Sequence, residues 1–299
     1  MLGLILLLLH VCSAHALCPN KTSGTIRQLA QFPNNTWVEN IAIRSNGQLL
    51  VTLFTSPDVY QIDPFPKHPV PPKLVAHFPD ALGLLGITEI KEDVFAIAKG
   101  IFDPSGDLTP GSFLVWKADF RGGREMPTLS RIADVPDTTI INGMTLVKKG
   151  GRILLLADSL AGVVWRLNLD TLKYDIVLND TTTRPNGALA EGGFGVDGVR
   201  CRDGFLFFTN TNLGFFRVRI RDDGTVVERV ERMAGFSGAD DFDFDDRADA
   251  ATLLEGTTGV MFGRTKYDRS TLYVTTNGGF EEAVPGEPIP GGRVLAIDH

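Results

Sequence analysis

The stretch Asp197-Gly198-Val199-Arg200-Cys201, followed by Asp203-Gly204 and then by Leu206-Phe207-Phe208-Thr209, indicates the fold of this chain. Two short apolar runs that are rich in Val, Leu and Phe and separated by an Asp-Gly turn predict an antiparallel β-hairpin. Runs of this kind recur throughout the chain, whereas helix signals are scarce. The sequence therefore predicts an all-β protein.

The same pattern repeats along the chain as a polar or small pair, an apolar strand, a turn with Gly or Asp, and a second strand. Its copies begin at Glu39, Leu85, Asn142, Asp197, Asp240 and Thr258. Further apolar runs lie between these pairs, so that each unit holds about four strands, which is the content of a propeller blade. We therefore predict a six-bladed β-propeller, in which residues 25–29 pair beside residues 292–297 to close the ring.

One unit is shorter than the others. The copy at Asp240 is followed by the next copy only 18 residues later, whereas the earlier starts lie 43 to 57 residues apart. Four strands of about 5 residues each, with their turns, do not fit into so short a segment. We therefore predict a fifth blade truncated around residues 246–256, within a single domain that spans residues 17–299.

The N-terminus predicts a secreted protein. Residues 2–9 form an apolar run that is too short to span a bilayer, and Ala14-His15-Ala16 has the spacing of a cleavage site. We therefore expect residues 1–16 to be a signal peptide, and the sequons at Asn20, Asn34 and Asn179 agree with glycosylation in the secretory pathway.

Two cysteines remain after the expected cleavage, Cys18 and Cys201. In an oxidising compartment we expect them to form one disulfide, and the alternative is a pair of buried free thiols.

Charge and composition narrow the range of partners. The net charge is −7 and the pI is near 5.3, and no basic run occurs, which opposes binding to nucleic acid or to an anionic membrane. No segment after the signal peptide approaches the roughly 20 apolar residues of a membrane span. We expect a monomer that binds small apolar substrates, for which 19 Phe residues supply apolar aromatic surface.

The starts of the repeated units predict the site. In a propeller the first strand of each blade lines the central channel, so these positions are expected to converge on the axis. Glu39, Asn142, Asp197 and Asp240 carry side-chain oxygens that suit a hard divalent cation, and calcium is the expected ion. The alternative is that Asn-Gly and Asp-Gly are ordinary turn dipeptides without a ligand. We expect no organic cofactor, because the sequence contains no Walker-type glycine loop.

The order of these residues resembles the metal tetrad of the senescence-marker-protein/gluconolactonase superfamily of six-bladed propellers, where Glu, Asn, Asn and Asp hold a divalent ion. This resemblance implies that Glu39, Asn142 and Asp197 are metal ligands and that Asp240 is both a ligand and the general base. Asp197 stands where the superfamily has an Asn, and it adds a negative charge.

A closer resemblance is carried by Leu84-Leu85-Gly86-Ile87-Thr88-Glu89, by Gly238-Ala239-Asp240-Asp241-Phe242 and by Thr275-Thr276-Asn277-Gly278-Gly279. These segments resemble a fungal branch of secreted propellers that includes the hetero-Diels-Alderases of tropolone-sesquiterpene biosynthesis. The resemblance implies a pericyclase that joins an oxygen-bearing diene, such as a quinone methide, to an apolar terpene alkene.

Such a reaction needs no nucleophile or redox cofactor, because orientation alone can supply about 7 to 11 kcal/mol of the barrier. Asn142, Asp240 and Thr258 form the expected catalytic set, with Asn142 or Thr258 donating a hydrogen bond to the diene oxygen. One alternative is a calcium-dependent lactonase in which Asp197 or Asp240 activates water. The other is a noncatalytic propeller that binds small molecules.

Overall fold

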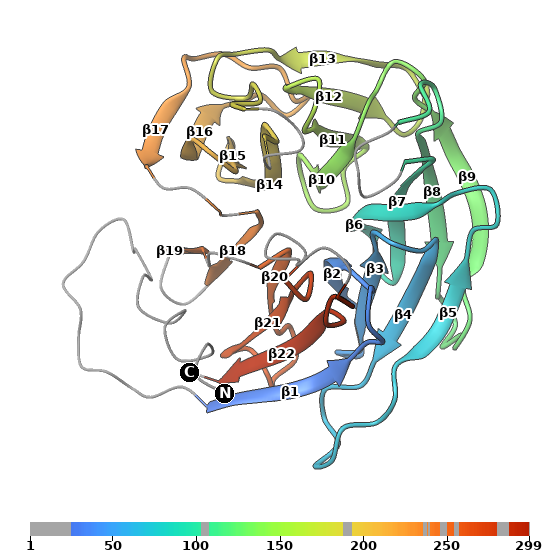
Figure 1. Cartoon of the computed structure of the whole chain (residues 1–299). Helices are drawn as coiled ribbons and strands as arrows, with labels where there is room; N and C mark the ends of the chain where they lie inside the picture. The colour runs from blue at the N-terminus through green and yellow to red at the C-terminus, as the bar shows by residue number, and fades with distance from the viewer. Residues whose placement is uncertain are drawn as a thin grey trace.

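A computed structural model shows β-sheets arranged around a central axis (Figure 1). It describes residues 25–102, 108–187, 193–235, 238, 240–245, 250–253, 257–279 and 287–298. Every regular element in these ranges is a β-strand. In the part of the chain that the structure describes, no helix is long and apolar enough to cross a membrane.

The strands of each blade follow one another in sequence from the axis outward. Blade 1 is β2-β3-β4-β5, at Val38–Ile43, Leu49–Leu53, Asp58–Ile62 and Lys73–His77. Blade 2 is β6-β7-β8-β9, at Gly83–Lys91, Val94–Gly100, Leu114–Asp119 and Thr128–Asp134. Blade 3 is β10-β11-β12-β13, at Ile141–Leu146, Ile153–Asp158, Val163–Asn168 and Tyr174–Leu178. Blade 4 is β14-β15-β16-β17, at Val196–Arg202, Phe205–Asn210, Gly214–Arg219 and Glu231–Ala234.

The all-β propeller is confirmed, but the prediction of six blades is wrong, because the described residues form five four-stranded blades. Where a shortened fifth blade was predicted, β18 (Phe242–Asp245) and β19 (Ala250–Leu253) pair as a two-stranded sheet. The segment between Asp240 and Thr258 has room for one hairpin and no more. Figure 1 shows this hairpin between blade 4 and the last blade.

The last blade joins the two ends of the described chain, as predicted. Its order is β20 (Gly259–Phe262), β21 (Thr271–Thr275), β22 (Arg293–Asp298) and β1 (Thr25–Gln31), counted from the axis. In the antiparallel pair β1-β22, Thr25 lies opposite Asp298 and Gln31 lies opposite Arg293. The side chain of Arg27 donates a hydrogen bond of 3.2 Å to Asp298 across this seam.

Glycines after the unit starts allow neighbouring innermost strands to lie close together. A Cβ atom added at Gly86 would lie 2.2 Å from the carbonyl oxygen of Asn142, and one at Gly143 would lie 2.3 Å from that of Asp197. Both distances are far below van der Waals contact, so a larger residue would force the blades apart. The polar-Gly dipeptides therefore have a packing role in addition to any role in binding.

Buried hydroxyl groups join several neighbouring blades near the axis. Thr52 donates a hydrogen bond of 2.7 Å to the carbonyl oxygen of Leu85, and Thr275 donates one of 3.2 Å to that of Glu39. Thr209 makes the equivalent bond of 2.5 Å to the carbonyl oxygen of Asp240. These bonds fix the backbone of the strand starts, which is where the candidate site lies.

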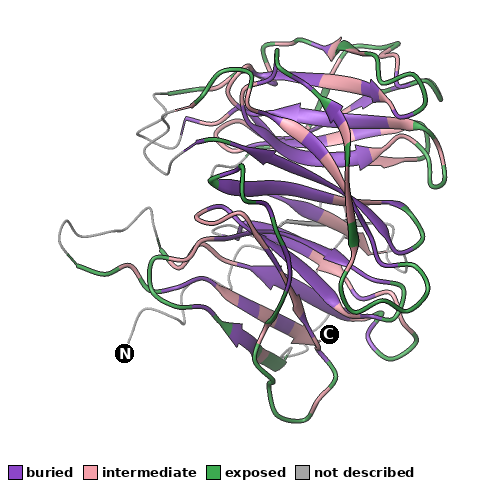
Figure 2. Cartoon of the chain, turned by 90° about the vertical axis from the view of Figure 1, so that its right-hand side faces the viewer, coloured by how far each residue is buried: buried purple, intermediate pink, exposed green. Residues whose placement is uncertain are grey.

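The core lies between the blades. Strand β11 shows this best, since Leu154, Leu155, Leu156 and Ala157 are all fully buried although alternate side chains point to opposite faces. Each face of the sheet is covered by a neighbouring blade, so consecutive residues of the strand are all apolar. Figure 2 shows the buried residues along the strands and the exposed residues mainly at the turns.

Candidate functional site

The structure brings Glu39, Asn142, Asp197 and Asp240 together at one end of the channel. The first three occupy the first or second position of the innermost strands β2, β10 and β14, and Asp240 lies just before β18. Asn142 acts on the pKa of Glu39, and Asp240 acts on the pKa of Asp197, so the side chains of each pair are neighbours. Glu39, Asn142 and Asp197 are buried, and Asp240 is half-buried.

A fifth residue of this group, Asp241, was missed by the sequence analysis. It is buried, and its carboxylate forms an ion pair of 2.7 Å with Arg200, while its charge acts on Glu39, Asp197 and Asp240. The signal was present in the stretch Asp240-Asp241-Phe242, where only the first aspartate matches the repeated register. We call these five residues, Glu39, Asn142, Asp197, Asp240 and Asp241, the acid ring.

Each member of the acid ring has one oxygen that is buried and accepts no hydrogen bond in the described structure. These atoms are Glu39 Oε2, Asn142 Oδ1, Asp197 Oδ1, Asp240 Oδ1 and Asp241 Oδ1. A buried polar atom without a partner destabilises a protein by about 1–3 kcal/mol. Five such atoms at one place indicate a site that is maintained for a ligand at the expense of stability.

Burial and mutual repulsion raise the pKa values of Glu39, Asp197 and Asp240. Loss of solvent raises the pKa of Glu39 well above its usual value, and the charges of Asp197 and Asp241 raise it further. Burial also raises the pKa of Asp197 to about 8, with a further contribution from Asp241. The pKa of Asp240 is raised well above its usual value by burial, then by the charges of Asp197 and Glu39. A carboxyl group that stays neutral near pH 7 can donate a hydrogen bond.

The remaining unit starts contribute differently. Thr258 is buried, but its hydroxyl donates a hydrogen bond of 2.6 Å to the carbonyl oxygen of Val38 and lies 3.0 Å from Thr275 Oγ1. That bond uses the one hydroxyl hydrogen of Thr258 and gives the residue a structural part, and its expected hydrogen bond to a diene oxygen stays a prediction. Leu85 is buried and apolar.

An aromatic cluster lies at the same end of the strands as the acid ring. Trp37 and Phe54 flank blade 1 at this end with ring centroids 4.8 Å apart, and Phe54 lies 4.7 Å from Phe102 of blade 2. Leu160 and Phe194, which precede β12 and β14, pack against the same cluster. The indole of Trp37 lies close enough to Glu39 to act on the pKa of its carboxyl group, so the apolar surface adjoins the acids. We call these residues the apolar mouth.

The oxygens of the acid ring are suitable ligands for a hard cation, but the side chains are not grouped as a preformed metal site. Its unpartnered oxygens are the ligand type that calcium prefers. However, among the described residues no three His, Cys, Asp or Glu side chains are grouped as a metal site requires. The predicted calcium ligands Glu39, Asn142, Asp197 and Asp240 therefore remain a prediction.

Other predicted residues fall partly outside the described ranges, including Cys18, Asn20 and the predicted signal peptide at 1–16. Cys201 lies on β14, forms no disulfide with any residue that the structure describes, and has a thiol pKa raised to about 12 by burial. The predicted glycosylation sites Asn34 and Asn179 are both exposed. Their modification stays a prediction.

The fold and the site together define a β-propeller with a ring of buried acidic side chains at one end of its channel. No family model matches the chain. It is 31% identical, over 84% of its length and 86% of the relative's, to a protein from Phoma sp named as a candidate hetero-Diels-Alderase. It is 25% identical, over 83% of its length and 77% of the relative's, to the candidate hetero-Diels-Alderase asR5 from Sarocladium schorii. The chain belongs to this hetero-Diels-Alderase family.

Solved structures agree on the fold alone. The major allergen Mala s 1 of Malassezia sympodialis matches with a TM-score of 0.60 at 10% identity, over 91% of this chain and 95% of that one. Virginiamycin B lyase from Staphylococcus aureus matches with a TM-score of 0.51 at 11% identity, over 93% of this chain and 100% of that one. At identities this low, the comparison supports the propeller architecture and gives no information about the reaction.

Proposed function

We propose that the protein is a secreted enzyme of secondary metabolism that catalyses a hetero-Diels-Alder reaction. In this reaction an oxygen-bearing diene, such as a quinone methide, forms one C–C and one C–O bond with an apolar alkene, and no proton is transferred overall. The observation that carries the proposal is the position of neutral carboxyl groups beside the apolar mouth, in a chain of this family.

The acid ring would act on the oxygen of the diene. A protonated Glu39 or Asp197 can donate a hydrogen bond to that oxygen, which stabilises the negative charge that develops there as the bonds form. Loss of one donor of this kind typically lowers the rate by about 100-fold to 1000-fold. Asn142, which lies beside Glu39 and acts on its pKa, would hold that carboxyl group in place.

The apolar mouth would act on the alkene. Trp37 and Phe194, which are half-buried, offer apolar surface next to the acids, without a charged group that would have to be desolvated. Holding the two reactants face to face can contribute about 7 to 11 kcal/mol. The apolar mouth and the acid ring together would also favour one face of the diene, so the product is expected to be a single enantiomer.

A matched pair of variants tests the role of the acids. Asp197→Asn keeps a neutral hydrogen-bond donor of the same shape, whereas Asp197→Leu removes it. We expect the enantiomeric excess and rate with a quinone methide and an alkene to be retained in Asp197→Asn and lost in Asp197→Leu. Retention of both in Asp197→Leu, or a racemic product from the wild type, would contradict the proposal.

A calcium-dependent lactonase is the second candidate, and the unpartnered oxygens of the acid ring favour it. A divalent ion bound there would polarise a lactone carbonyl, and Asp240 would be placed to activate water. Chelation separates the two candidates, because the cycloaddition is expected to continue after EDTA treatment whereas lactone hydrolysis would stop. Metal-dependent lactonase activity without cycloadduct above the uncatalysed background would replace the first candidate by the second.

A further inference from the structure

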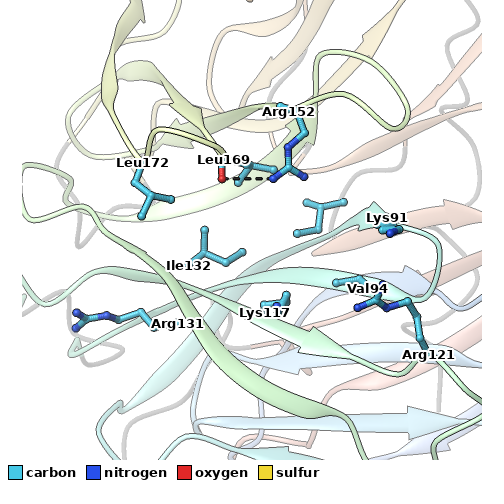
Figure 3. A pocket seen from close by; sticks show the side chains of 10 residues that line it. Lys91, Val94, Lys117, Arg121, Arg131, Ile132, Arg152, Leu169 and Leu172 are labelled. Carbon is cyan, nitrogen blue, oxygen red and sulfur yellow. Dashed lines mark hydrogen bonds between the residues drawn. The ribbon is translucent and has the colours of Figure 1, made fainter.

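A cavity of about 360 Å³ lies between blades 2 and 3, at the opposite end of the strands from the acid ring. The acid ring lies at the starts of the innermost strands. The cavity is lined by residues at the other end, such as Lys91, the last residue of β6. Figure 3 shows blade 2 side chains on one side and Arg152, Leu169 and Leu172 of blade 3 on the other. Its cationic residues are Lys91, Lys117, Arg121, Arg131 and Arg152.

The arginines of the cavity pair with carboxylates beside them. Arg121 pairs with Asp119 at 2.5 Å, and this bond lowers the pKa of Asp119 to about 2. Arg131 pairs with Asp134 at 3.1 Å, and Arg152 pairs with Asp170 at 2.7 Å. Each of these three arginines is thus paired with a carboxylate, although all three side chains are more than half exposed.

The two lysines have no such partner. Neither Lys91 nor Lys117 forms an ion pair with any residue in the described part of the chain. Five cations thus face three carboxylates, and the cavity is locally positive in a protein with a net charge of −7. An anion would complete this arrangement.

The side chain of Leu172 indicates that the ligand also has an apolar part. It is 48% exposed and has a φ of 58°, a left-handed conformation that Gly or Asn adopts more readily. A branched residue in this conformation strains the backbone, because its Cβ atom lies too close to the following carbonyl oxygen. Because burial does not offset this strain, we infer that the side chain is retained for the apolar wall that it forms with Ile132 and Leu169.

We propose that this cavity binds an organic anion that has one anionic head group on an apolar body. The head group would lie among Lys91, Lys117 and the paired arginines, and the body would pack against Leu172 and Ile132. The volume lies at the lower end of ligand pockets, which suits a molecule of one or two rings. The proposal is independent of the proposed function, since the cavity and the acid ring lie at opposite ends of the strands.

Calorimetric titration of the full chain with 1-naphthoate and 1-naphthyl phosphate tests the proposal, with 1-naphthalenemethanol as a neutral probe of similar shape. We expect at least one naphthyl anion to bind saturably, and the alcohol to bind about tenfold or more weakly. Inorganic phosphate, which lacks the apolar body, is expected to bind more weakly than naphthyl phosphate. The preference between the two anions identifies the head group.

Three variants locate the binding. The double variant Lys91→Gln/Lys117→Gln is expected to bind the anion about tenfold more weakly, and Lys67→Gln, an exposed lysine elsewhere, to leave binding unchanged. Leu172→Asn is expected to weaken binding without lowering the unfolding midpoint, because Asn tolerates the left-handed conformation. Equal binding of the naphthyl anion and the alcohol, unchanged affinity in the lysine variant, or no saturable binding would overturn the proposal.

Discussion

The protonated state of Asp197 has a measurable effect on stability. Its pKa is about 8 in the folded protein and 3.8 in the unfolded chain, since burial disfavours its charged form. Between these two values the folded state holds a proton that the unfolded state has released, so rising pH favours unfolding. Each pH unit in this window lowers the free energy of unfolding by about 1.4 kcal/mol for one proton released on unfolding.

The perturbation is Asp197→Asn, which replaces the carboxyl group with an amide that does not titrate. We expect the urea midpoint of the wild type to fall as the pH rises from 5 to 8, and the variant to show a flatter dependence over the same range. Asp222→Asn provides the control, since that side chain is 80% exposed in the turn between β16 and β17. Its pH dependence is expected to match that of the wild type.

The opposite result would refute the reasoning. If Asp197→Asn and the wild type show the same slope, then Asp197 is ionised in the folded protein. A bound cation would produce that state, because it stabilises the carboxylate. Repeating the titration with calcium and with EDTA distinguishes the two cases, because only a bound cation makes the slope depend on calcium.

Three further outcomes are expected. Gly143→Ala would place a Cβ atom 2.3 Å from the carbonyl oxygen of Asp197, and is expected to lower the unfolding free energy by more than about 2 kcal/mol in chemical denaturation. Thr52→Val would leave the carbonyl oxygen of Leu85 without its bond, and is expected to lower it by about 1–3 kcal/mol. Nonreducing peptide mapping of secreted protein is expected to find Cys201 in a disulfide with the N-terminal peptide, and recovery of the free thiol would refute that bridge.

Much of the architecture was readable from the sequence because the unit starts recur at a common register. The positions Glu39, Asn142 and Asp197 lie at matching places on the innermost strands, so their convergence follows from the repeat alone. The number of blades was harder to predict from the sequence. The repeat start at Asp240 indicates that a unit begins there, but it does not indicate how many strands follow.

The chemistry of the site depended on contacts that spacing cannot supply. Asp241 adjoins the expected Asp240, but its membership of the acid ring depends on Arg200, which lies 41 residues earlier and on another sheet. The bond from Thr258 to Val38 joins residues 220 positions apart. No local pattern indicates such partners, and the same is true of the five cations that two blades bring to the cavity.

The seam between β1 and β22 determines when the acid ring is assembled. Blades 1 to 4 use strands that are consecutive in sequence, so each can form as its own segment leaves the ribosome. The seam instead joins residues 271 positions apart, as the bond from Arg27 to Asp298 shows. Strand β1 must therefore wait, with its pairing edge open, until almost the whole chain has been made. The backbone carbonyl oxygen of Glu39 accepts its bond from Thr275 of the last blade, so we expect a nascent propeller to have four blades before the strand start at Glu39 is fixed.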